Sequence, residues 1–252
     1  AAEALPPGAA GFDSEALIDA AARLAPGYPL VYGSGLDLTP DLVEQLGRDR
    51  DVFGNPPDVL RLFRTPPAFF ALLRQLEIPY PETRFEPPET PGSWLVKAGC
   101  SEGGKGVRFR AQSQPEPGDY FQRLLPGVPL SALFLADGTN ATILGFNTQW
   151  TASHFGRPFL FVGAINRAVL SEDQRRQVEG YVARLVRATG LRGLGSLDFL
   201  ADGGLCRVLE VNARPSSTLA LYDADVPRGL LVRHIAACQG RLDGMGAVTG
   251  PV

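Results

Sequence analysis

The run Glu210-Val211-Asn212-Ala213-Arg214-Pro215 carries more structural information than any other part of this sequence. It reads as the end of a strand, and residues two apart in a strand point to the same face, so Glu210 and Asn212 present two oxygen ligands side by side. Such oxygens suit magnesium, which also takes phosphate oxygens from a nucleotide. Arg214 could then hold a phosphoryl group or a substrate carboxylate in a forked contact. The run predicts a magnesium and phosphate site, and a polar strand edge is the alternative.

The strand before this run, residues 196–200, supplies a further carboxylate, Asp198. If Asp202-Gly203 alone formed the hairpin turn, Asp198 would pair opposite Arg207 and face away from Glu210. A three-residue loop, Asp202-Gly203-Gly204, with a glycine bulge would instead set Asp198 opposite Val208 and on the face of Glu210. We therefore predict the three-residue loop and place Asp198 in the metal site.

A second candidate site lies in residues 94–107, where Lys97 ends a strand and a glycine-rich loop, Ser101 to Gly106, follows. Glycines let backbone N–H groups approach an anion, and a lysine offsets the charge of phosphates. Of the 24 basic residues all but Lys97 and Lys105 are arginine, so both compact point charges fall in this segment. The segment lacks the Gly-Lys-Ser/Thr of a Walker loop, and a strand follows it. A plain hairpin is the alternative interpretation.

Together these segments resemble the ATP-grasp superfamily, which includes biotin carboxylase, D-alanine:D-alanine ligase and the purine-synthesis carboxylate ligases. A more distant similarity is to the tyramine:glutamate ligase of methanofuran synthesis. The resemblance extends from about Asn55 to Gly240, most of the chain. It implies an α/β (α+β) ATP-grasp fold in which ATP and Mg lie between a lid and a C-terminal lobe.

The resemblance also implies roles for individual residues. It makes Lys97 and Arg214 catalytic, and it makes the loop a lid over the phosphates. The run Phe121 to Gly127 resembles the family's strand beside adenine. The implied nucleotide-binding residues are Lys97, Ser101, Glu102, Gly103, Gly104, Lys105, Gly106, Gln122, Arg123, Leu124 and Leu125, and the implied metal ligands are Asp198, Glu210 and Asn212.

Three positions depart from the family's pattern. Ala98 follows the lysine where a proline is usual, and Pro129 stands where an acidic residue would bind ribose. An upstream lysine is also usual, yet residues 64–67 read Arg-Thr-Pro-Pro and leave Arg64 as the only basic residue there. These departures bear on nucleotide affinity and base choice.

The order of patterns predicts three parts. Residues 1–55 form a partial N-terminal α/β domain, with a strand at 29–35 and a helix capped by Thr39. Residues 56–140 form linker helices and the lid, and residues 141–252 form the C-terminal lobe. An antiparallel sheet is expected within 109–149, and a helix capped by Ser171 is expected to end at Gly190.

Composition narrows the class of partner. A formal charge of -3 with 20% charged residues provides no basic field for nucleic acid, and no apolar stretch is long enough to span a bilayer. Three scattered cysteines and two histidines lack the spacing of a disulfide framework or zinc site. We expect a cytoplasmic protein with small-molecule partners and no nucleic-acid or membrane partner, and a homodimer is left open.

The function implied is an ATP-dependent carboxylate-amine or carboxylate-thiol ligase that acts through an acyl phosphate and releases ADP and phosphate. A small-molecule kinase on the same fold and a non-catalytic nucleotide sensor are the alternatives. A dinucleotide-binding protein built on Gly33-Ser34-Gly35 is disfavoured, because the rest of that fingerprint is missing.

Overall fold

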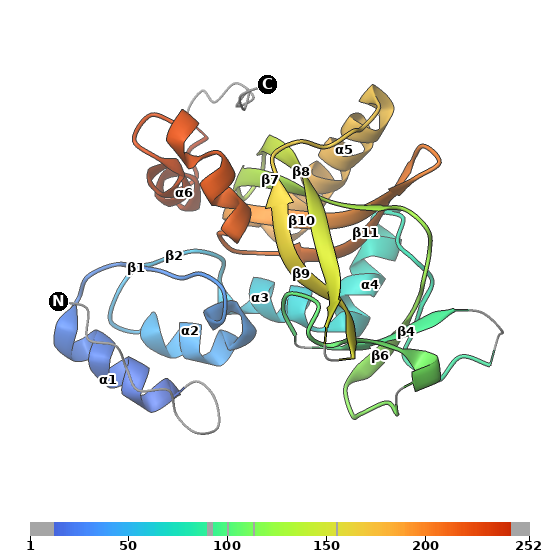
Figure 1. Cartoon of the computed structure of the whole chain (residues 1–252). Coiled ribbons are helices and arrows are strands. Elements are labelled where there is room, and N and C mark those ends of the chain that lie inside the picture. The colour runs from blue at the N-terminus through green and yellow to red at the C-terminus, as the bar shows by residue number, and fades with distance from the viewer. Residues whose placement is uncertain (1–12, 90–92, 100, 113, 155, 243–252) are drawn as a thin grey trace.

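The computed structural model describes residues 13–89, 93–99, 101–112, 114–154 and 156–242. A small N-terminal part, a lid and a larger sheet-based lobe meet around one central region (Figure 1). The fold is mixed α/β, as predicted, and its two larger sheets are antiparallel.

The N-terminal part is a strand-helix-strand unit preceded by a helix. It contains α1 (Ser14–Leu24), β1 (Leu30–Val31), the 3-10 turn η1 (Leu36–Leu38), α2 (Pro40–Leu46) and β2 (Val52–Phe53). The strand predicted at 29–35 is shorter than expected, and β2 gives it a parallel partner. Thr39 precedes α2 as predicted but makes no side-chain cap, because its hydroxyl donates to the Leu36 carbonyl instead.

The lid follows two linker helices, α3 (Pro57–Arg64) and α4 (Pro66–Gln75). Its sheet has the order β3-β6-β4-β5, with β3 (Thr83–Arg84), β4 (Trp94–Ala98), β5 (Val107–Phe109) and β6 (Asp119–Arg123), and the turn η2 (Arg110–Gln112) follows β5. Trp94, Val96 and Phe121 form its buried apolar cluster. A strand does follow the glycine loop, as predicted from the sequence.

The larger lobe is built on the sheet β11-β10-β7-β8-β9. Its strands are β7 (Val128–Asp137), β8 (Ala141–His154), β9 (Arg157–Ile165), β10 (Arg192–Asp202) and β11 (Leu205–Asn212), and its helices are α5 (Glu172–Thr189) and α6 (Leu230–Cys238), with the turns η3 (Ser217–Leu221) and η4 (Asp223–Asp225). The predicted boundary between the lid and the C-terminal lobe lies at residue 140. β7 precedes that residue and pairs with β8 after it, so this boundary would divide the sheet. The boundary between the lobes stays a prediction.

The middle of the sheet is buried on both faces, as the alternation along β7 shows. Ala132, Phe134 and Ala136 pack in the cluster that contains the inner face of α5. Leu133 and Leu135 pack in the cluster that contains Leu230 and Ala237 of α6. The capping box at Ser171 and the left-handed Gly190 bound α5 as predicted. This covered sheet is a rigid base for the residues on β10 and β11.

Candidate functional site

The β10–β11 hairpin places Asp198 directly opposite Glu210, but not by the predicted loop. The hairpin turn is Gly203-Gly204, both glycines have positive φ, and Asp202 pairs with Leu205, so the predicted three-residue loop is wrong. The ladder then shifts between Asp198 and Phe199, with Leu209 as the extra residue of β11. Without that bulge Asp198 would oppose Leu209, and Glu210 would point to the other face.

Two carboxylates therefore share one face of the hairpin. Burial raises the pKa of Asp198 well above its ordinary value, and the adjacent Glu210 carboxylate raises it further, against a hydrogen bond from Gln149 that lowers it. Two like charges held side by side disfavour each other unless a cation lies between them. This electrostatic strain fits a divalent cation, although the described residues contain no cluster of three or more His, Cys, Asp or Glu ligands.

Asn212, the third predicted ligand, is buried at the end of β11. Its amide nitrogen donates to Ser196 Oγ at 3.3 Å and lies 3.4 Å from Glu210 Oε1, while its oxygen accepts from Arg214 at 3.3 Å. The amide must turn over to offer its oxygen to a cation beside Glu210. The amide oxygen of Asn212 is a ligand type that fits the cation and lies near its expected position. In this structure, however, that oxygen accepts a hydrogen bond from Arg214.

Lys97 is the last but one residue of β4, in the lid, and its charge interacts with both carboxylates of this site. Its Nζ donates to Gln122 Oε1 at 3.2 Å and lies 5.7 Å from the centre of the Tyr120 ring. Burial alone would lower the pKa of Lys97, but Tyr120, Glu210 and Asp198 outweigh it and raise that pKa above its ordinary value. The ammonium group therefore stays charged, and the two carboxylates of the larger lobe are among the groups that favour its charge.

The predicted adenine strand includes Gln122, which is bound on both sides of its amide. Besides accepting from Lys97, it donates to Thr83 Oγ1 at 3.1 Å. The backbone N–H groups of Arg123 and Leu124 donate to the carbonyls of Glu82 and Ser93. Gln122 therefore positions Lys97 in this structure. It stays a prediction that residues 122–125 contact an adenine base.

The glycine loop lies folded against the larger lobe. The Phe161 N–H of β9 donates to the Gly103 carbonyl at 3.0 Å, and a Cβ on Gly104 would lie 1.8 Å from the Phe159 carbonyl oxygen. Gly104 has φ +74°, a region that favours glycine. The glycines thus allow close contact with β9, and Lys105 is left exposed at the loop tip.

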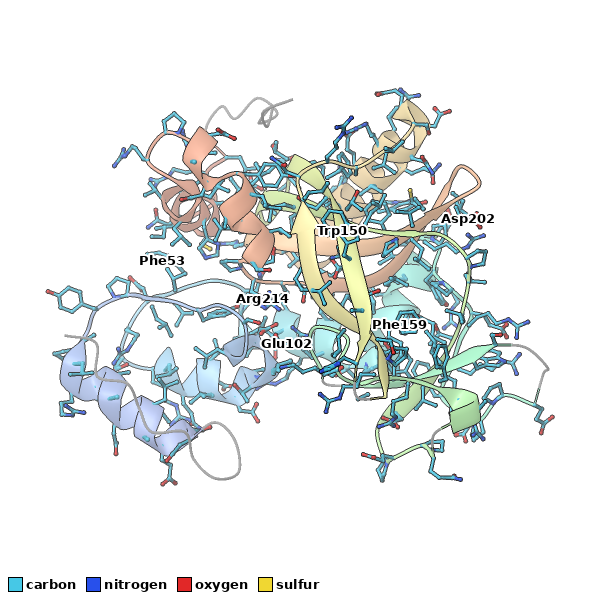
Figure 2. The ribbon with its side chains drawn as sticks, in the orientation of Figure 1. Phe53, Glu102, Trp150, Phe159, Asp202 and Arg214 are labelled. Atoms are coloured by element: carbon cyan, nitrogen blue, oxygen red, sulfur yellow. The ribbon has the colours of Figure 1, made fainter. Side chains whose placement is uncertain are left out.

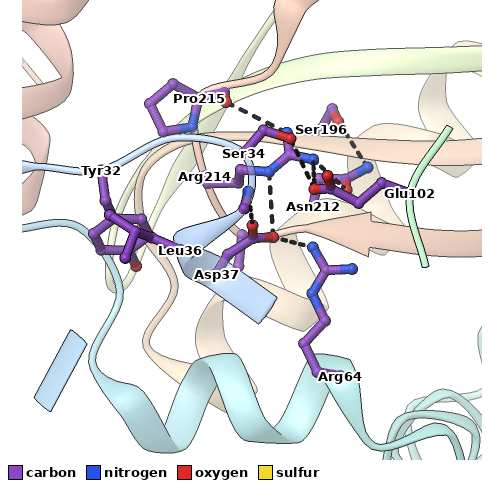
Figure 3. A network of polar contacts seen from close by, with 12 residues as sticks. Tyr32, Ser34, Leu36, Asp37, Arg64, Glu102, Ser196, Asn212, Arg214 and Pro215 are labelled. Atoms are coloured by element: carbon purple, nitrogen blue, oxygen red, sulfur yellow. Dashed lines mark hydrogen bonds and ion pairs between the residues drawn. The ribbon is translucent and has the colours of Figure 1, made fainter. Parts of the chain in front are cut away.

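Glu102, at the start of that loop, contacts Arg214 rather than lying free for a nucleotide. Its Oε1 accepts from Arg214 Nη2 at 3.0 Å and from Ser34 Oγ at 2.7 Å (Figure 3). Burial alone would raise the pKa of Glu102, but the Ser34 hydroxyl and Arg214 outweigh it and hold that pKa below its ordinary value. A carboxylate would repel phosphate, so only the backbone of Glu102 suits the predicted nucleotide role.

Sequence reasoning missed Asp37, whose side chain is fully buried between two arginines. It forms an ion pair with Arg64, and its Oδ2 lies 3.2 Å from Arg214 Nε without the alignment of a hydrogen bond. The Gly35 N–H donates to Asp37 Oδ1 at 3.1 Å. The only signal in the sequence is an acid between two leucines in Leu36-Asp37-Leu38. Asp37, which is itself paired with Arg64, thus orients Arg214 from the N-terminal part.

Asn55 fixes the backbone on either side of the site. Its amide nitrogen donates to the carbonyls of Arg192 and Ala213, and its oxygen accepts from the Arg192 N–H. These bonds join the linker to the start of β10 and to the residue before Arg214. Figure 2 shows Arg214 and Glu102 close together, where the N-terminal part, the loop and the larger lobe meet.

Neither the two described cysteines nor His234 contacts the residues of this site. Cys206 is buried and Cys238 is partly buried, both are free thiols, and Cys100 lies outside the described residues. His234 is buried between β2 and β10, where Nδ1 accepts from the Leu194 N–H at 2.8 Å and Nε2 lies 3.0 Å from the Phe53 carbonyl. Among the described helices none has the length and apolarity to cross a bilayer.

The sequence and the fold of this chain have counterparts among known proteins. A family model described as an ATP-grasp domain matches residues 68–218, more than half of the chain. No curated protein matches the sequence.

Among solved structures, the chain is similar to biotin carboxylase from Campylobacter jejuni in complex with β,γ-ATP, with 15% identity and a TM-score of 0.76 over 92% of this chain and 59% of that one. It is similar to the biotin carboxylase domain of Hydrogenobacter thermophilus 2-oxoglutarate carboxylase, a dimer with MgADP, ADP and bicarbonate, with 16% identity and a TM-score of 0.73 over 90% and 57%. A pyruvate carboxylase variant from Rhizobium etli gives 20% identity and a TM-score of 0.77 over 94% and 24%. The chain thus spans at most about three fifths of the length of these three proteins.

Proposed function

The chain belongs to the ATP-grasp family, and on that premise we propose that it is a magnesium-dependent ligase, which uses ATP to activate a carboxylate for attack by an amine or a thiol. The observation that carries the proposal is the ladder pair Asp198–Glu210, faced by Lys97 from the lid and continued by Arg214 at the end of the same strand. Similar structures contain ATP analogues or MgADP, which supports the same ligands for this chain.

Each group in this arrangement has one physical role. Asp198, Glu210 and, after rotation of its amide, Asn212 would hold magnesium, which supplies charge neutralisation for the phosphates when bound. Lys97, on the lid strand β4, would contact the phosphates of ATP, and the loop backbone from Ser101 to Gly106 would cover these phosphates. The loop already contacts β9 through Gly103 and Gly104, so the loop itself can close the site over the phosphates.

Arg214 is placed to orient the reacting carboxylate. Its side chain is 9% exposed, and its guanidinium contacts Asn212 and Glu102. A carboxylate oxygen aligned there would attack the terminal phosphoryl group in line, and alignment with charge neutralisation is what such a transfer requires. The acyl phosphate formed is an anhydride, and a closed loop excludes water until the nucleophile attacks its carbonyl carbon and phosphate leaves.

The test is product analysis with a panel of carboxylates, each paired with amines and thiols. Bicarbonate belongs in the panel because a similar carboxylase domain was solved with that anion. We expect ADP, free phosphate and an amide or thioester together, and we expect Glu210→Ala to abolish all three. Glu179→Ala, on the exposed face of α5, is the control for loss of a carboxylate. A stable phosphorylated product without free phosphate would identify a kinase, and ATP binding without turnover across the panel would identify a sensor.

A further inference from the structure

The carboxylate of Glu102 lies in a seat formed by two segments far apart in the sequence. Ser34 comes from the turn between β1 and η1, and Arg214 follows β11 (Figure 3). Both donate to the same oxygen, Oε1, at 2.7 and 3.0 Å. The Gly33-Ser34-Gly35 turn, which fits no dinucleotide fingerprint, thus has a defined contact with an anion.

Arg214 has two anionic partners at this seat, Asp37 and Glu102. The side chains of Arg64 and Arg214 are 13% and 9% exposed, and Asp37, which lies between them, is fully buried. Asp37 is therefore shared by two arginines, and Glu102 is the second partner of Arg214. Leaving a poorly exposed charge without its partner is unfavourable, so the position beside Arg214 favours an anion. Glu102 supplies that anion in this structure.

We propose that Ser34 and Arg214 form the subsite for the substrate's carboxylate, and that Glu102 occupies this subsite from within until the substrate displaces it. This inference rests on the proposed function and adds the residues that select the acid. A carboxylate monoanion would replace the charge of Glu102 one for one, whereas a phosphate dianion would add a negative charge. An oxygen between a hydroxyl and a guanidinium is the contact that a carboxylate would repeat.

Glu102 is suited to leave the seat. Its side chain remains 27% exposed, and it begins a glycine loop whose described contact with β9 includes a single backbone hydrogen bond, Phe161 to Gly103. Substrate binding must therefore compete with Glu102, and the apparent affinity is reduced by the fraction of molecules in which the seat is filled. Removing the Glu102 charge removes the competitor and leaves both donors in place.

The experiment compares acetate binding in the wild type, Glu102→Gln and Glu86→Gln. Glu86 is an exposed lid residue, so its variant carries the same charge change away from the seat. Acetate is titrated at constant ionic strength against chloride, and binding is measured by calorimetry and by thermal unfolding. We expect Glu102→Gln to bind acetate at least ~10-fold more tightly than the wild type and Glu86→Gln to match the wild type. Adding Ser34→Ala to Glu102→Gln should reverse the gain.

Two outcomes overturn the proposal: equal acetate affinity in all three proteins, or a gain in Glu102→Gln that Ser34→Ala leaves intact. Binding of MgATP, measured separately on the same proteins, keeps this result distinct from the proposed function. A gain in acetate affinity in a protein that binds no MgATP would support the carboxylate seat and contradict the ligase. Turnover of ATP without the gain would support the ligase and contradict the seat.

Discussion

Asp198 lies opposite Glu210 because β11 accommodates Leu209 as an extra residue. The Gly203-Gly204 turn alone would bring Asp198 opposite Leu209, since its ladder pairs Phe199 with Val208. The bulge corrects the register by one residue, and a one-residue shift moves a side chain to the other face of a sheet. The two carboxylates of the candidate metal site are therefore brought together by an irregularity beside the site.

This pairing predicts that Asp198→Asn stabilises the metal-free protein at pH 7. Burial and Glu210 raise the pKa of Asp198, so the folded state binds its proton more tightly than the unfolded state does. Stability attributed to this group therefore falls as the pH rises from the ordinary aspartate pKa, about 3.9, through the raised value. The asparagine variant lacks this loss.

Thermal unfolding between pH 4 and 8 in chelator measures the effect, and each kcal/mol corresponds to roughly 2–4 °C in a protein of this size. The advantage of Asp198→Asn should shrink as the pH falls toward 4. Asp19→Asn, on the exposed face of α1, is the control and should leave the melting temperature unchanged. A variant less stable than the wild type at pH 7 would contradict the electrostatic interpretation.

Lys97→Arg should impair ATP-dependent turnover although it conserves the charge. Lys97 is packed against Gln122 and Tyr120, and a flat guanidinium is larger than an ammonium group. It should misplace the phosphates by on the order of an ångström and reduce kcat/KM by ~100-fold. Lys105 is exposed, so Lys105→Arg is the matched control and should be tolerated. Similar, near-normal rates in both variants would remove Lys97 from the site.

Gly103 and Gly104 form a matched pair for testing the docked loop. Both have positive φ, so alanine strains the backbone at either position, by ~1 kcal/mol. Only at position 104 would the added Cβ also collide with β9, at 1.8 Å from the Phe159 carbonyl oxygen, whereas position 103 is open. Gly104→Ala should therefore undock the loop and raise KM for ATP well beyond the effect of Gly103→Ala. Hydrogen exchange of the Phe161 N–H reports docking directly, and equal exchange in the two variants would contradict this account.

His234 should contribute stability that is lost in acid. Burial lowers its pKa, against the Phe53 carbonyl, which raises it, so the folded state binds this proton less readily than the unfolded chain. The contribution is fully present above the ordinary histidine pKa of about 6.5 and is lost as the pH falls through the lowered value. Protonation would also break the bond from the Leu194 N–H to Nδ1.

His234→Ala leaves that N–H and the Phe53 carbonyl without their partner and should cost about 2–6 kcal/mol at pH 7, from roughly 1–3 kcal/mol for each of the two unsatisfied groups. The penalty should decrease toward pH 5, as measured by urea unfolding. His154→Ala, at an exposed position of β8, should have a much smaller effect. A penalty that does not vary with pH would show that packing, rather than the neutral ring, explains the contribution of His234.

Local patterns in the sequence predicted much of the site. The spacing of Glu210 and Asn212 places them on one strand, and their oxygen types indicate magnesium, because strand periodicity and ligand chemistry are local properties. Lys97, the glycine loop and the strand after it were predicted for the same reason. The helix α5 was predicted from its two ends, since Ser171 and Gly190 determine caps through their own backbone and side-chain chemistry.

Contacts between distant segments could not be predicted in this way. The hairpin loop was predicted wrongly because the position of a bulge depends on how β10 packs against β7 and β11 together. Gln122 carries no sequence signal that it holds Lys97, and Asp37 carries none that it lies between Arg64 and Arg214.

The sequence by itself therefore determined which chemical groups are present and which of them share a strand, since side-chain type and strand period act over a few residues. Only the tertiary structure decided that Ser34, Glu102 and Arg214 meet, although the last two are 112 positions apart in the chain. The physical reason is that their meeting depends on burial of the middle of the sheet between its helices and on the ion pairs around Asp37. Both are properties of the packed molecule, and no single segment contains them.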